Sequence, residues 1–193
     1  MIEREIEAKY MLTLASFLKL KTTFFASSSC QTQTNHYFDT LDGYISHQHH
    51  AMLRVREKGD HCVLTLKAPN PNGEGLLEYH QDSFQWDHSA GTLLIGPGTV
   101  ATQLSLWHTP TDALRHRTSL MTHRYEIKED DVVICLDENH YGGTIDYEIE
   151  CEHHSIKEAQ QRLALLFSDL PDAPRLSILN KVQRAFATLS QTK

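Results

Sequence analysis

The chain has 193 residues, of which 40% are hydrophobic and 22% charged, and this balance excludes a disordered or collagen-like chain. Its 25 acidic residues outnumber its 18 basic residues, so the formal net charge is −7. A protein that coats nucleic acid needs excess positive charge to displace counterions from phosphates, and the charge therefore argues against that class. The length suits a single domain over residues 1–193.

The sequence also argues against a membrane or secreted protein. The longest strongly apolar run, Val132–Leu136, is far shorter than the roughly 20 residues that span a bilayer. The amino terminus, MIEREIEAKY, lacks the apolar segment of a signal peptide. Cysteines 30, 62, 135 and 151 form no CxxC pair, so we expect a cytoplasmic protein with reduced, buried thiols.

Alternation of apolar and polar residues, which is the period of a strand, dominates the chain. It predicts eight strands, at residues 2–10, 33–39, 51–58, 61–68, 75–85, 118–128, 131–138 and 144–152. Turn-forming segments such as Lys58–Asp60 and the charged run Glu129–Asp131 separate several of them. Eight strands joined mostly by short turns favour an antiparallel barrel or sandwich.

Helical patterns lie between the strands, so the predicted class is α+β but mainly β. The first helix is expected at 13–22, and 88–107 is expected to form two short helices separated by Gly96–Gly98. A capping box, Ser155 with Glu158, opens a third helical segment. A final amphipathic helix is predicted over Ser177–Leu189.

The polar positions of the strands carry the chemistry. Glu5, Glu7 and Lys9 share one face of the first strand, because alternate residues point the same way. Four further strands repeat the arrangement, with apolar residues on the opposite face: Arg54 and Arg56; Thr65 and Lys67; Glu78 and His80; and Asp146, Glu148, Glu150 and Glu152. If the sheet closes, the apolar faces pack outward and the charged faces point together into one lumen.

Electrostatics constrains that lumen. Two neighbouring carboxylates repel by about 4 kcal/mol at an effective dielectric constant of 20. A hard divalent cation with oxygen ligands explains a row of four such groups, Glu5, Glu7, Glu148 and Glu150. Arginine guanidinium groups can bind phosphate oxygens through two hydrogen bonds, and lysine ammonium groups bind them as point charges. The candidate phosphate-binding residues are Arg54, Arg56, Arg124, Lys9 and Lys67. Glycine-rich phosphate loops of the GxxxxGK[ST] and GxGxxG types are missing, so phosphate binding would depend on side chains.

These residues resemble a known family. EIEAK at residues 5–9 is similar to the ExExK signature of the CYTH domain, the triphosphate tunnel metalloenzyme superfamily. Further matches follow in the family's order: NHYFDT (35–40), LRVR (53–56), LTLK (64–67), LLE (76–78), Arg124, LDEN (136–139), YEIE (147–150) and Lys181. The chain looks most like the small bacterial stand-alone members, some of which are labelled adenylate cyclases.

The resemblance implies an eight-stranded antiparallel β-barrel, open as a tunnel and flanked by helices, that binds a triphosphate with Mg²⁺ or Mn²⁺. The implied metal ligands are Glu5, Glu7, Asp137, Glu148 and Glu150. The implied substrate-binding residues are Lys9, Arg54, Arg56, Lys67, Arg124 and Lys181. The catalytic set expected from both groups is Glu5, Glu7, Lys9, Arg54, Arg56, Lys67, Arg124, Glu148 and Glu150.

Two features depart from the family pattern, and one position is left without a role. Histidines 47, 49 and 50 precede LRVR, where smaller residues are expected. Arg115 and Arg117 lie upstream of Arg124, whose assignment therefore depends on its strand context. Glu78 matches an acidic position of undecided role.

Three functions follow from this reading. The first is divalent-metal-dependent hydrolysis of an inorganic or organic triphosphate, in which no serine or cysteine nucleophile is needed. The second is a class IV-type adenylate cyclase, which converts ATP to cyclic AMP and pyrophosphate. The third is a non-catalytic polyphosphate- or nucleotide-binding module. In each case the partner is a small molecule containing a triphosphate or related polyanion; the oligomeric state stays open, with a homodimer as one option.

Overall fold

The computed structural model describes residues 1–129, 132–177 and 179–189. Ten strands form one antiparallel sheet in the order β1-β6-β5-β4-β3-β9-β10-β11-β2-β12. They are β1 (Ile2–Glu5), β2 (Glu7–Leu12), β3 (Gln31–Asp39), β4 (Met52–Lys58), β5 (His61–Pro69), β6 (Leu76–Gln81), β9 (Arg115–Glu129), β10 (Val132–Tyr141), β11 (Thr144–Glu152) and β12 (Arg175–Leu176).

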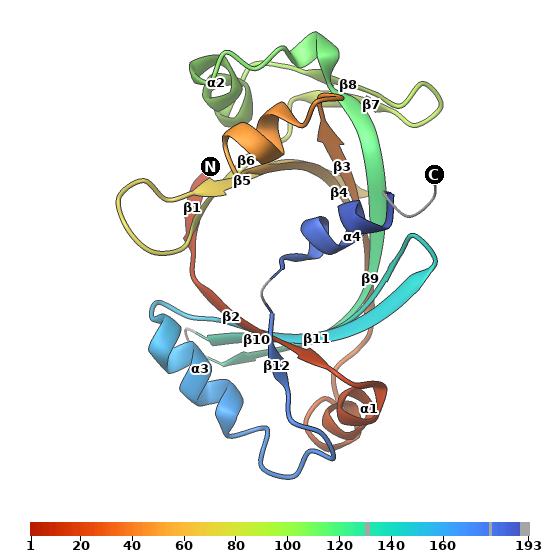
Figure 1. Cartoon of the computed structure of the whole chain (residues 1–193), viewed down its shortest axis with the longest axis vertical. Helices are drawn as coiled ribbons and strands as arrows, with labels where there is room; N and C mark the ends of the chain where they lie inside the picture. Colours follow the sequence, from red (N-terminus) through yellow and green to blue (C-terminus); the bar gives the residue numbers. More distant parts are fainter. Residues whose placement is uncertain (130–131, 178, 190–193) are drawn as a thin grey trace.

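The sheet closes through its first strand. Only Ile6 separates β1 from β2, yet β1 pairs with β6 and β2 pairs with β11. The chain itself therefore joins β1, at one end of the sheet, to β2, the next-to-last strand at the other end, and the sheet curls into the ring seen in Figure 1. The mainly β class and the curled antiparallel sheet are confirmed, but the sheet has ten strands rather than the eight expected. The single strand expected at 2–10 is β1 and β2, and the short strand β12 is added.

The loop before β6 supports this bend. Gly75 has a φ of +86°, and a Cβ atom added there would lie 2.2 Å from the carbonyl oxygen of Glu5. A larger residue would collide with backbone, which cannot move aside as a flexible side chain can. Glycine at this position therefore lets the loop pack against the point where the first strand is interrupted.

A small hairpin corrects two sequence predictions. β7 (Phe84–Asp87) pairs with β8 (Thr92–Ile95), so the strand expected at 75–85 is two strands, and the first helix expected within 88–107 is wrong. The turn decides the outcome: the Asp87 carboxylate accepts hydrogen bonds from the backbone N–H groups of Ser89 and Ala90. The second predicted helix exists as α2 (Thr99–Leu106).

Two of the other helices, α1 (Leu14–Thr23) and α3 (Ile156–Ala164), begin close to where the sequence predicts. The remaining helical elements are α4 (Lys181–Leu189), a π-helical turn at Tyr44–Gln48 and a 3₁₀ turn at Thr111–Ala113. Ser155 accepts from the Glu158 N–H, but the Ser155 N–H donates to His153, so only half of the expected capping box forms.

The last helix starts later than predicted, at Lys181 rather than Ser177. Its start is a reciprocal cap between Asn180 and Gln183. The Gln183 N–H donates to Asn180 Oδ1 at 2.9 Å, and the Asn180 N–H donates to Gln183 Oε1 at 2.9 Å. This cap fixes where Lys181 sits in the first turn.

Apolar packing lies mainly outside the barrel. α2 and the β7–β8 hairpin cover one apolar cluster, which includes Val55 and Leu66, and α1 and α3 cover a second, which includes Leu20 and Ile149. Full burial of one such side chain stabilises the fold by about 1.5–3 kcal/mol. Since the outer faces of the strands carry this core, their inner faces are free to carry charge.

α4 is the exception, because it lies across the opening of the ring in Figure 1. Its Val182 and Ala185 pack with Tyr37, Leu120 and Tyr141 of the barrel. The helix therefore brings its polar residues to the charged inner face.

The cysteine and membrane predictions are partly tested. Cys135 and Cys151 are buried, but Cys30 and Cys62 are exposed, so the expectation of buried thiols is wrong for two of the four. All four are free thiols. Across the described residues, no helix has the length and apolar character needed to cross a membrane. The predicted turn at Glu129–Asp131 includes residues 130 and 131, which lie outside the described part of the chain.

Candidate active site

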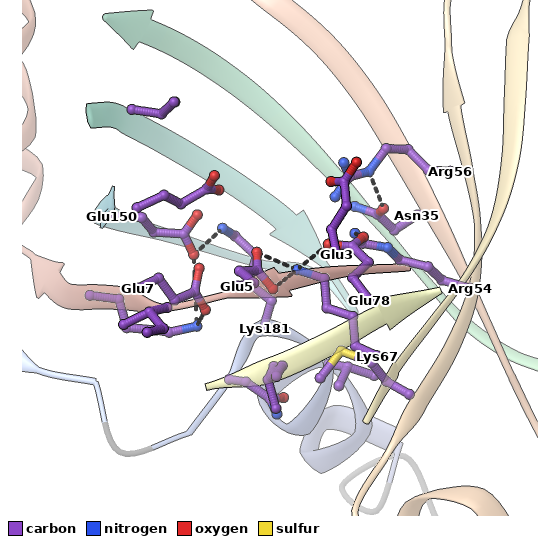
Figure 2. Close-up of a pocket in the computed structure, with 18 of the residues that line it drawn as sticks. Glu3, Glu5, Glu7, Asn35, Arg54, Arg56, Lys67, Glu78, Glu150 and Lys181 are labelled. Atoms are coloured by element: carbon purple, nitrogen blue, oxygen red, sulfur yellow. Dashed lines mark hydrogen bonds and ion pairs between the residues drawn. The ribbon is translucent and has the colours of Figure 1, made fainter. Parts of the chain in front are cut away.

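A polar cavity of about 450 Å³ occupies the barrel (Figure 2). Its size is that of a small-ligand site. Its lining includes ten of the residues that the sequence singled out, namely Glu5, Glu7, Lys9, Arg54, Arg56, Lys67, Glu78, Arg124, Glu150 and Lys181. The charged faces of strands far apart in the sequence thus point into one space, as the alternation indicated. Asp137 and Glu148, the other two, have no exposed surface and contact Lys181.

One wall carries a network centred on Glu78. Its carboxylate accepts from Arg54 at 2.9 Å and lies 3.2 Å from the Lys67 ammonium, which also contacts Glu5. Burial acts to raise the pKa of Glu78, but the charges of Arg54, Lys67 and Arg56 outweigh it and hold the pKa at about 2. Glu78 is therefore ionised at neutral pH. The sequence suggests no role for it, but in the structure its carboxylate orients Arg54 and Lys67.

Arg56 lies next to this network without an acidic partner. Its Nε donates to Asn35 Oδ1 at 3.2 Å, and among the described residues no carboxylate lies within ion-pair distance of it. Burial and the neighbouring charge of Arg54 lower the pKa of Arg56 to about 10, so it stays charged at neutral pH. The buried Nε of Arg54 also lacks a hydrogen-bond partner. Two adjacent guanidiniums, one buried and one half-buried, have unused donors, and this is the arrangement that an anion with several oxygens would satisfy.

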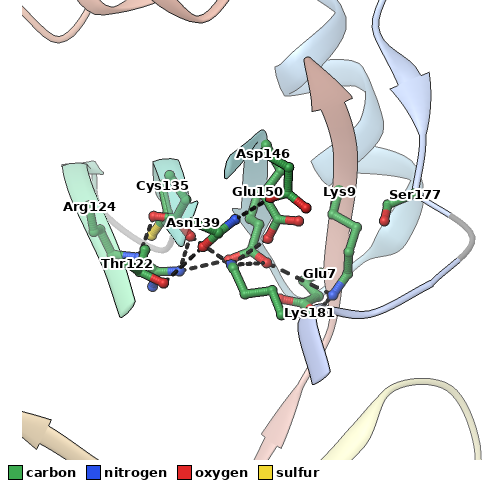
Figure 3. Close-up of polar contacts among 12 residues, drawn as sticks. Glu7, Lys9, Thr122, Arg124, Cys135, Asn139, Asp146, Glu150, Ser177 and Lys181 are labelled. Carbon is green, nitrogen blue, oxygen red and sulfur yellow. Dashed lines mark hydrogen bonds and ion pairs between the residues drawn. The ribbon is translucent and has the colours of Figure 1, made fainter. Parts of the chain in front are cut away.

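The opposite wall is a dense ionic network, drawn in Figure 3. Arg124 donates to Asp137 at 2.8 and 2.6 Å and to Glu150 at 2.8 Å. Lys181 contacts Asp137 at 2.6 Å, Glu150 at 2.9 Å, and also Glu148. Burial opposes ionisation of Glu150, but the charges of Lys181, Lys9 and Arg124 lower its pKa well below the usual range. Burial and the charge of Glu150 raise the pKa of Glu148 instead.

Two carboxylate groups have the geometry of cation sites. Oxygens of Glu5, Glu7 and Glu152 lie within 4.8 Å of one another, as do oxygens of Asp137, Glu148 and Glu150. The predicted single row is therefore divided, with Lys9 between the two groups: it contacts Glu7 and lies 3.9 Å from Glu150. Both donor sets consist of carboxylate oxygens, which suit a hard divalent cation.

The first group also shows the crowding of negative charge that a cation would neutralise. Burial, and then the charges of Glu5, Glu150 and Glu7, raise the pKa of Glu152 to about 7. Its side chain lines the cavity. The crowded carboxylates of this group therefore fit a bound metal ion, which would neutralise their charge.

Three members of the site lie outside the set that the sequence predicts. Glu152 shares the charged face of β11 with Glu148 and Glu150, but the sequence pattern alone assigns it no role. Arg184 donates to Asp146 at 2.8 Å and contacts Glu148; it follows Lys181 by three residues, so helical spacing places both on one face and could have revealed it. Asn35 lies within the NHYFDT motif, but its bond to Arg56 spans two strands and has no local signature.

The departures from the family pattern lie outside the cavity lining. Arg115 donates to the backbone oxygens of Asp112 and Leu114, and Arg117 contacts the Thr40 backbone oxygen, whereas Arg124 lies in the cavity. His49 stacks on Trp107, with ring centroids 4.2 Å apart and planes 7° apart. This packing gives that histidine a structural role.

Comparisons with known proteins agree with this architecture. Residues 3–185 match the CYTH domain family. The chain is 37% identical over 188 residues to the Bacillus subtilis protein named "Putative triphosphatase YjbK", and the match covers 95% of each chain. A solved structure of a "putative adenylate cyclase" from Bacillus halodurans superposes with a TM-score of 0.77 at 30% identity, covering 96% of this chain and 98% of the other.

A more distant structure shares the fold. The Hippeastrum protein HpAC1, described as a "putative adenylyl cyclase" with a dominant triphosphatase activity, gives a TM-score of 0.62 at 20% identity, with 95% of each chain covered. The family match covers residues 3–185, so it includes all ten strands of the sheet apart from Ile2 at the start of β1. The chain therefore belongs to the CYTH domain family.

Proposed function

We propose that this protein is a metal-dependent triphosphatase that hydrolyses inorganic triphosphate, or an organic triphosphate, inside the barrel. The single observation that carries the proposal is the cavity lining, in which cations with unused donors face two groups of carboxylates. Binding of a polyanion alone does not call for so many acidic side chains beside the cations. A metal–polyphosphate complex calls for both.

The basic residues are assigned to the phosphates. Arg54 and Arg56 offer directional donors, and the remaining cations supply charge at other points along the chain of phosphates: Lys9, Lys67, Arg124 and Lys181. As water adds to the terminal phosphorus and the bridging P–O bond breaks, negative charge moves to the bridging oxygen. Fixed cations on the cavity wall stabilise that charge without having to reorganise.

The acidic residues are assigned to the metal. Glu5, Glu7, Asp137, Glu148 and Glu150 would hold Mg²⁺ or Mn²⁺. We add Glu152 to this set, because its carboxylate lies within 4.8 Å of those of Glu5 and Glu7. When bound, the ion supplies Lewis-acid activation of the phosphate and lowers the pKa of water. Glu78 is assigned to positioning, since it holds Arg54 and Lys67.

A substrate panel tests the proposal. Purified protein is incubated with inorganic triphosphate, ATP and pyrophosphate, each with Mg²⁺, with Mn²⁺ or with EDTA, and the products are separated by ion-exchange chromatography. We expect orthophosphate and pyrophosphate from triphosphate, dependent on the added metal. Absence of turnover with every triphosphate in both metals would reject the assignment.

The second candidate is adenylate cyclase, because a relative at 30% identity carries that description. Cyclisation of ATP would use the same cations and metal, but it also needs a site for adenine and for the ribose 3′-hydroxyl. The cavity lining is dominated by charged side chains, which favours hydrolysis. The same panel separates the two reactions: cyclic AMP and pyrophosphate from ATP would establish the cyclase, and orthophosphate without cyclic AMP would reject it.

We also propose that the chain acts as one domain in the cytoplasm. Four free thiols, two of them exposed, suit a reducing compartment. Fractionation of cells that produce the protein, followed by immunodetection, tests the location.

A further inference from the structure

A second polar cluster lies on the outside of the barrel, beside the β7–β8 hairpin. His36 of β3 stands between Asn35 and Tyr37, which both line the cavity, so the alternation of the strand directs His36 outward. Glu57 of β4 and His88, which follows β7, meet it there. The His36 Nε2 to Glu57 Oε2 distance is 3.2 Å, and the His88 Nε2 to Glu57 Oε1 distance is 2.8 Å.

The buried ring nitrogen of His36 is not used. Its Nε2 atom has no solvent contact and makes no hydrogen bond, although the carboxylate is near. The other ring nitrogen is held: His36 Nδ1 lies 2.8 Å from Ser119 Oγ, and Ser119 Oγ lies 2.9 Å from His116 Nε2. The geometry around Ser119 accommodates a chain in which His36 Nδ1–H donates to Ser119 and Ser119 O–H donates to His116.

These hydrogen bonds would leave His36 ready to bind a metal ion. If Nδ1 carries the proton, the lone pair of Nε2 points toward Glu57 and is free to bind a metal. An outer hydrogen bond that fixes the tautomer in this way is typical of metal-ligating histidines. The ring is also packed on its sides by Trp86, at a centroid distance of 5.6 Å, which limits its rotation.

The distances suit a first-row transition metal. One ligand atom from each of His36, Glu57 and His88 lies within 4.8 Å of the others. Tetrahedral zinc with bonds of about 2.0–2.1 Å separates its ligands by about 3.3 Å, so small movements of the side chains would suffice. The His88 side chain is 58% exposed, which leaves an entry path for the ion.

We propose that His36, Glu57 and His88 form a binding site for a zinc-class divalent ion, with water in the remaining position. The three ligands come from β3, from β4 and from the residue after β7, so the ion would fasten the hairpin to the barrel wall. Two imidazoles and one carboxylate select such metals over Mg²⁺, which prefers oxygen alone. The site is distinct from the cavity and does not depend on the proposed activity.

A comparable group elsewhere provides a matched control. His123, Glu138 and His140 also place three ligand atoms within 4.8 Å, on β9 and β10. There His140 Nε2 pairs with Glu138 at 2.7 Å and His123 Nδ1 pairs with Thr32 at 3.0 Å. Unlike the first group, it has no buried ring nitrogen without a hydrogen bond.

The test uses Co²⁺ as a spectroscopic probe. Chelator-treated protein is titrated with Co²⁺ in excess Mg²⁺, which occupies the carboxylate groups of the cavity, and the visible d–d absorption is recorded. We expect one Co²⁺ per chain that Zn²⁺ displaces. His88→Ala should lose this signal and His140→Ala should keep it, while Ser119→Ala should weaken Co²⁺ binding about 10–100-fold.

Three results would overturn the proposal. The first is the absence of a Co²⁺ absorption signal in the native protein when Mg²⁺ is in excess. The others are equal loss of the signal in His88→Ala and His140→Ala, or its loss in His140→Ala alone. Circular dichroism in EDTA shows whether each variant is folded, and the exposed position of His88 makes its replacement a mild one. A rise in Tm with Zn²⁺ in the native protein, missing in His88→Ala, would support the link between the hairpin and the wall.

Discussion

Replacement of Lys181 by methionine should strongly destabilise the protein. Its ammonium lies 2.6 Å from Asp137 and 2.9 Å from Glu150, and it also contacts Glu148. At an effective dielectric constant of 20, each of the first two contacts represents a gross attraction of about 6 kcal/mol, much of which desolvation offsets. Removing one partner of a buried ion pair costs about 3–5 kcal/mol, and we expect a loss in that range.

The pH dependence gives the sharper measurement. Lys181, Lys9 and Arg124 hold the pKa of Glu150 low in the folded protein. Ionised Glu150 therefore adds stability at pH values above the unfolded pKa of about 4.3, and this stability is lost as the pH falls through the lower folded pKa. Without Lys181 the carboxylates take up protons at higher pH. The difference in unfolding free energy between native protein and variant should therefore be largest near pH 7 and shrink toward pH 4.

Urea unfolding followed by tryptophan fluorescence, in EDTA and at a series of pH values, measures this difference. Lys19→Met is the matched control, because Lys19 is an exposed lysine on α1 and its replacement should change stability by no more than about 0.5 kcal/mol. If Lys181→Met costs no more than the control, or if the difference grows in acid, the compensation of buried carboxylates by Lys181 is refuted.

Three further changes test other parts of the site. Glu5→Gln should reduce triphosphate hydrolysis by at least about 100-fold, while triphosphate binding stays as tight or tightens. The control is Glu3→Gln, on the same strand face but with 58% of its side chain exposed, which should leave turnover unchanged. Equal effects of the two substitutions would exclude a metal role for Glu5. The folded pKa of Glu152 is raised to about 7, so its ionisation costs stability as the pH rises from about 4.5 through 7. Glu152→Gln should therefore stabilise the metal-free protein by about 2 kcal/mol at pH 8 and have little effect at pH 4. Chemical denaturation in EDTA measures the difference. Asn180→Ala removes the cap shared with Gln183, and we expect a loss of about 1 kcal/mol in unfolding free energy; an unchanged Tm would contradict the capping role.

Local periodicity was enough for most of the strands. Alternation is a property of neighbouring residues, so the inward-facing residues on β2, β4, β5 and β11 could be identified without knowledge of pairing. It failed at 92–95, where Thr-Leu-Leu-Ile suits a helix or a strand equally. The turn at Asp87 and the pairing with β7 decided the question, and neither is visible in a short apolar run.

The partners of the charged residues could not be predicted in the same way. The sequence indicated one row of carboxylates, but the structure separates Glu5, Glu7 and Glu152 from Asp137, Glu148 and Glu150. Which carboxylates meet depends on strand register and on the closure of the barrel at Ile6. The Arg56–Asn35 bond likewise exists only because β3 pairs with β4 in one register.

The charged side of each strand follows from the sequence alone, because it depends on a repeat of two residues along the chain. The fold sets which cation meets which carboxylate and how deeply each is buried, and it lets α4 bring Lys181 and Arg184 to the acidic wall. The two differ in range: side-chain direction is set by the local backbone, whereas pKa values and ion pairs depend on groups brought within a few ångströms from distant parts of the chain.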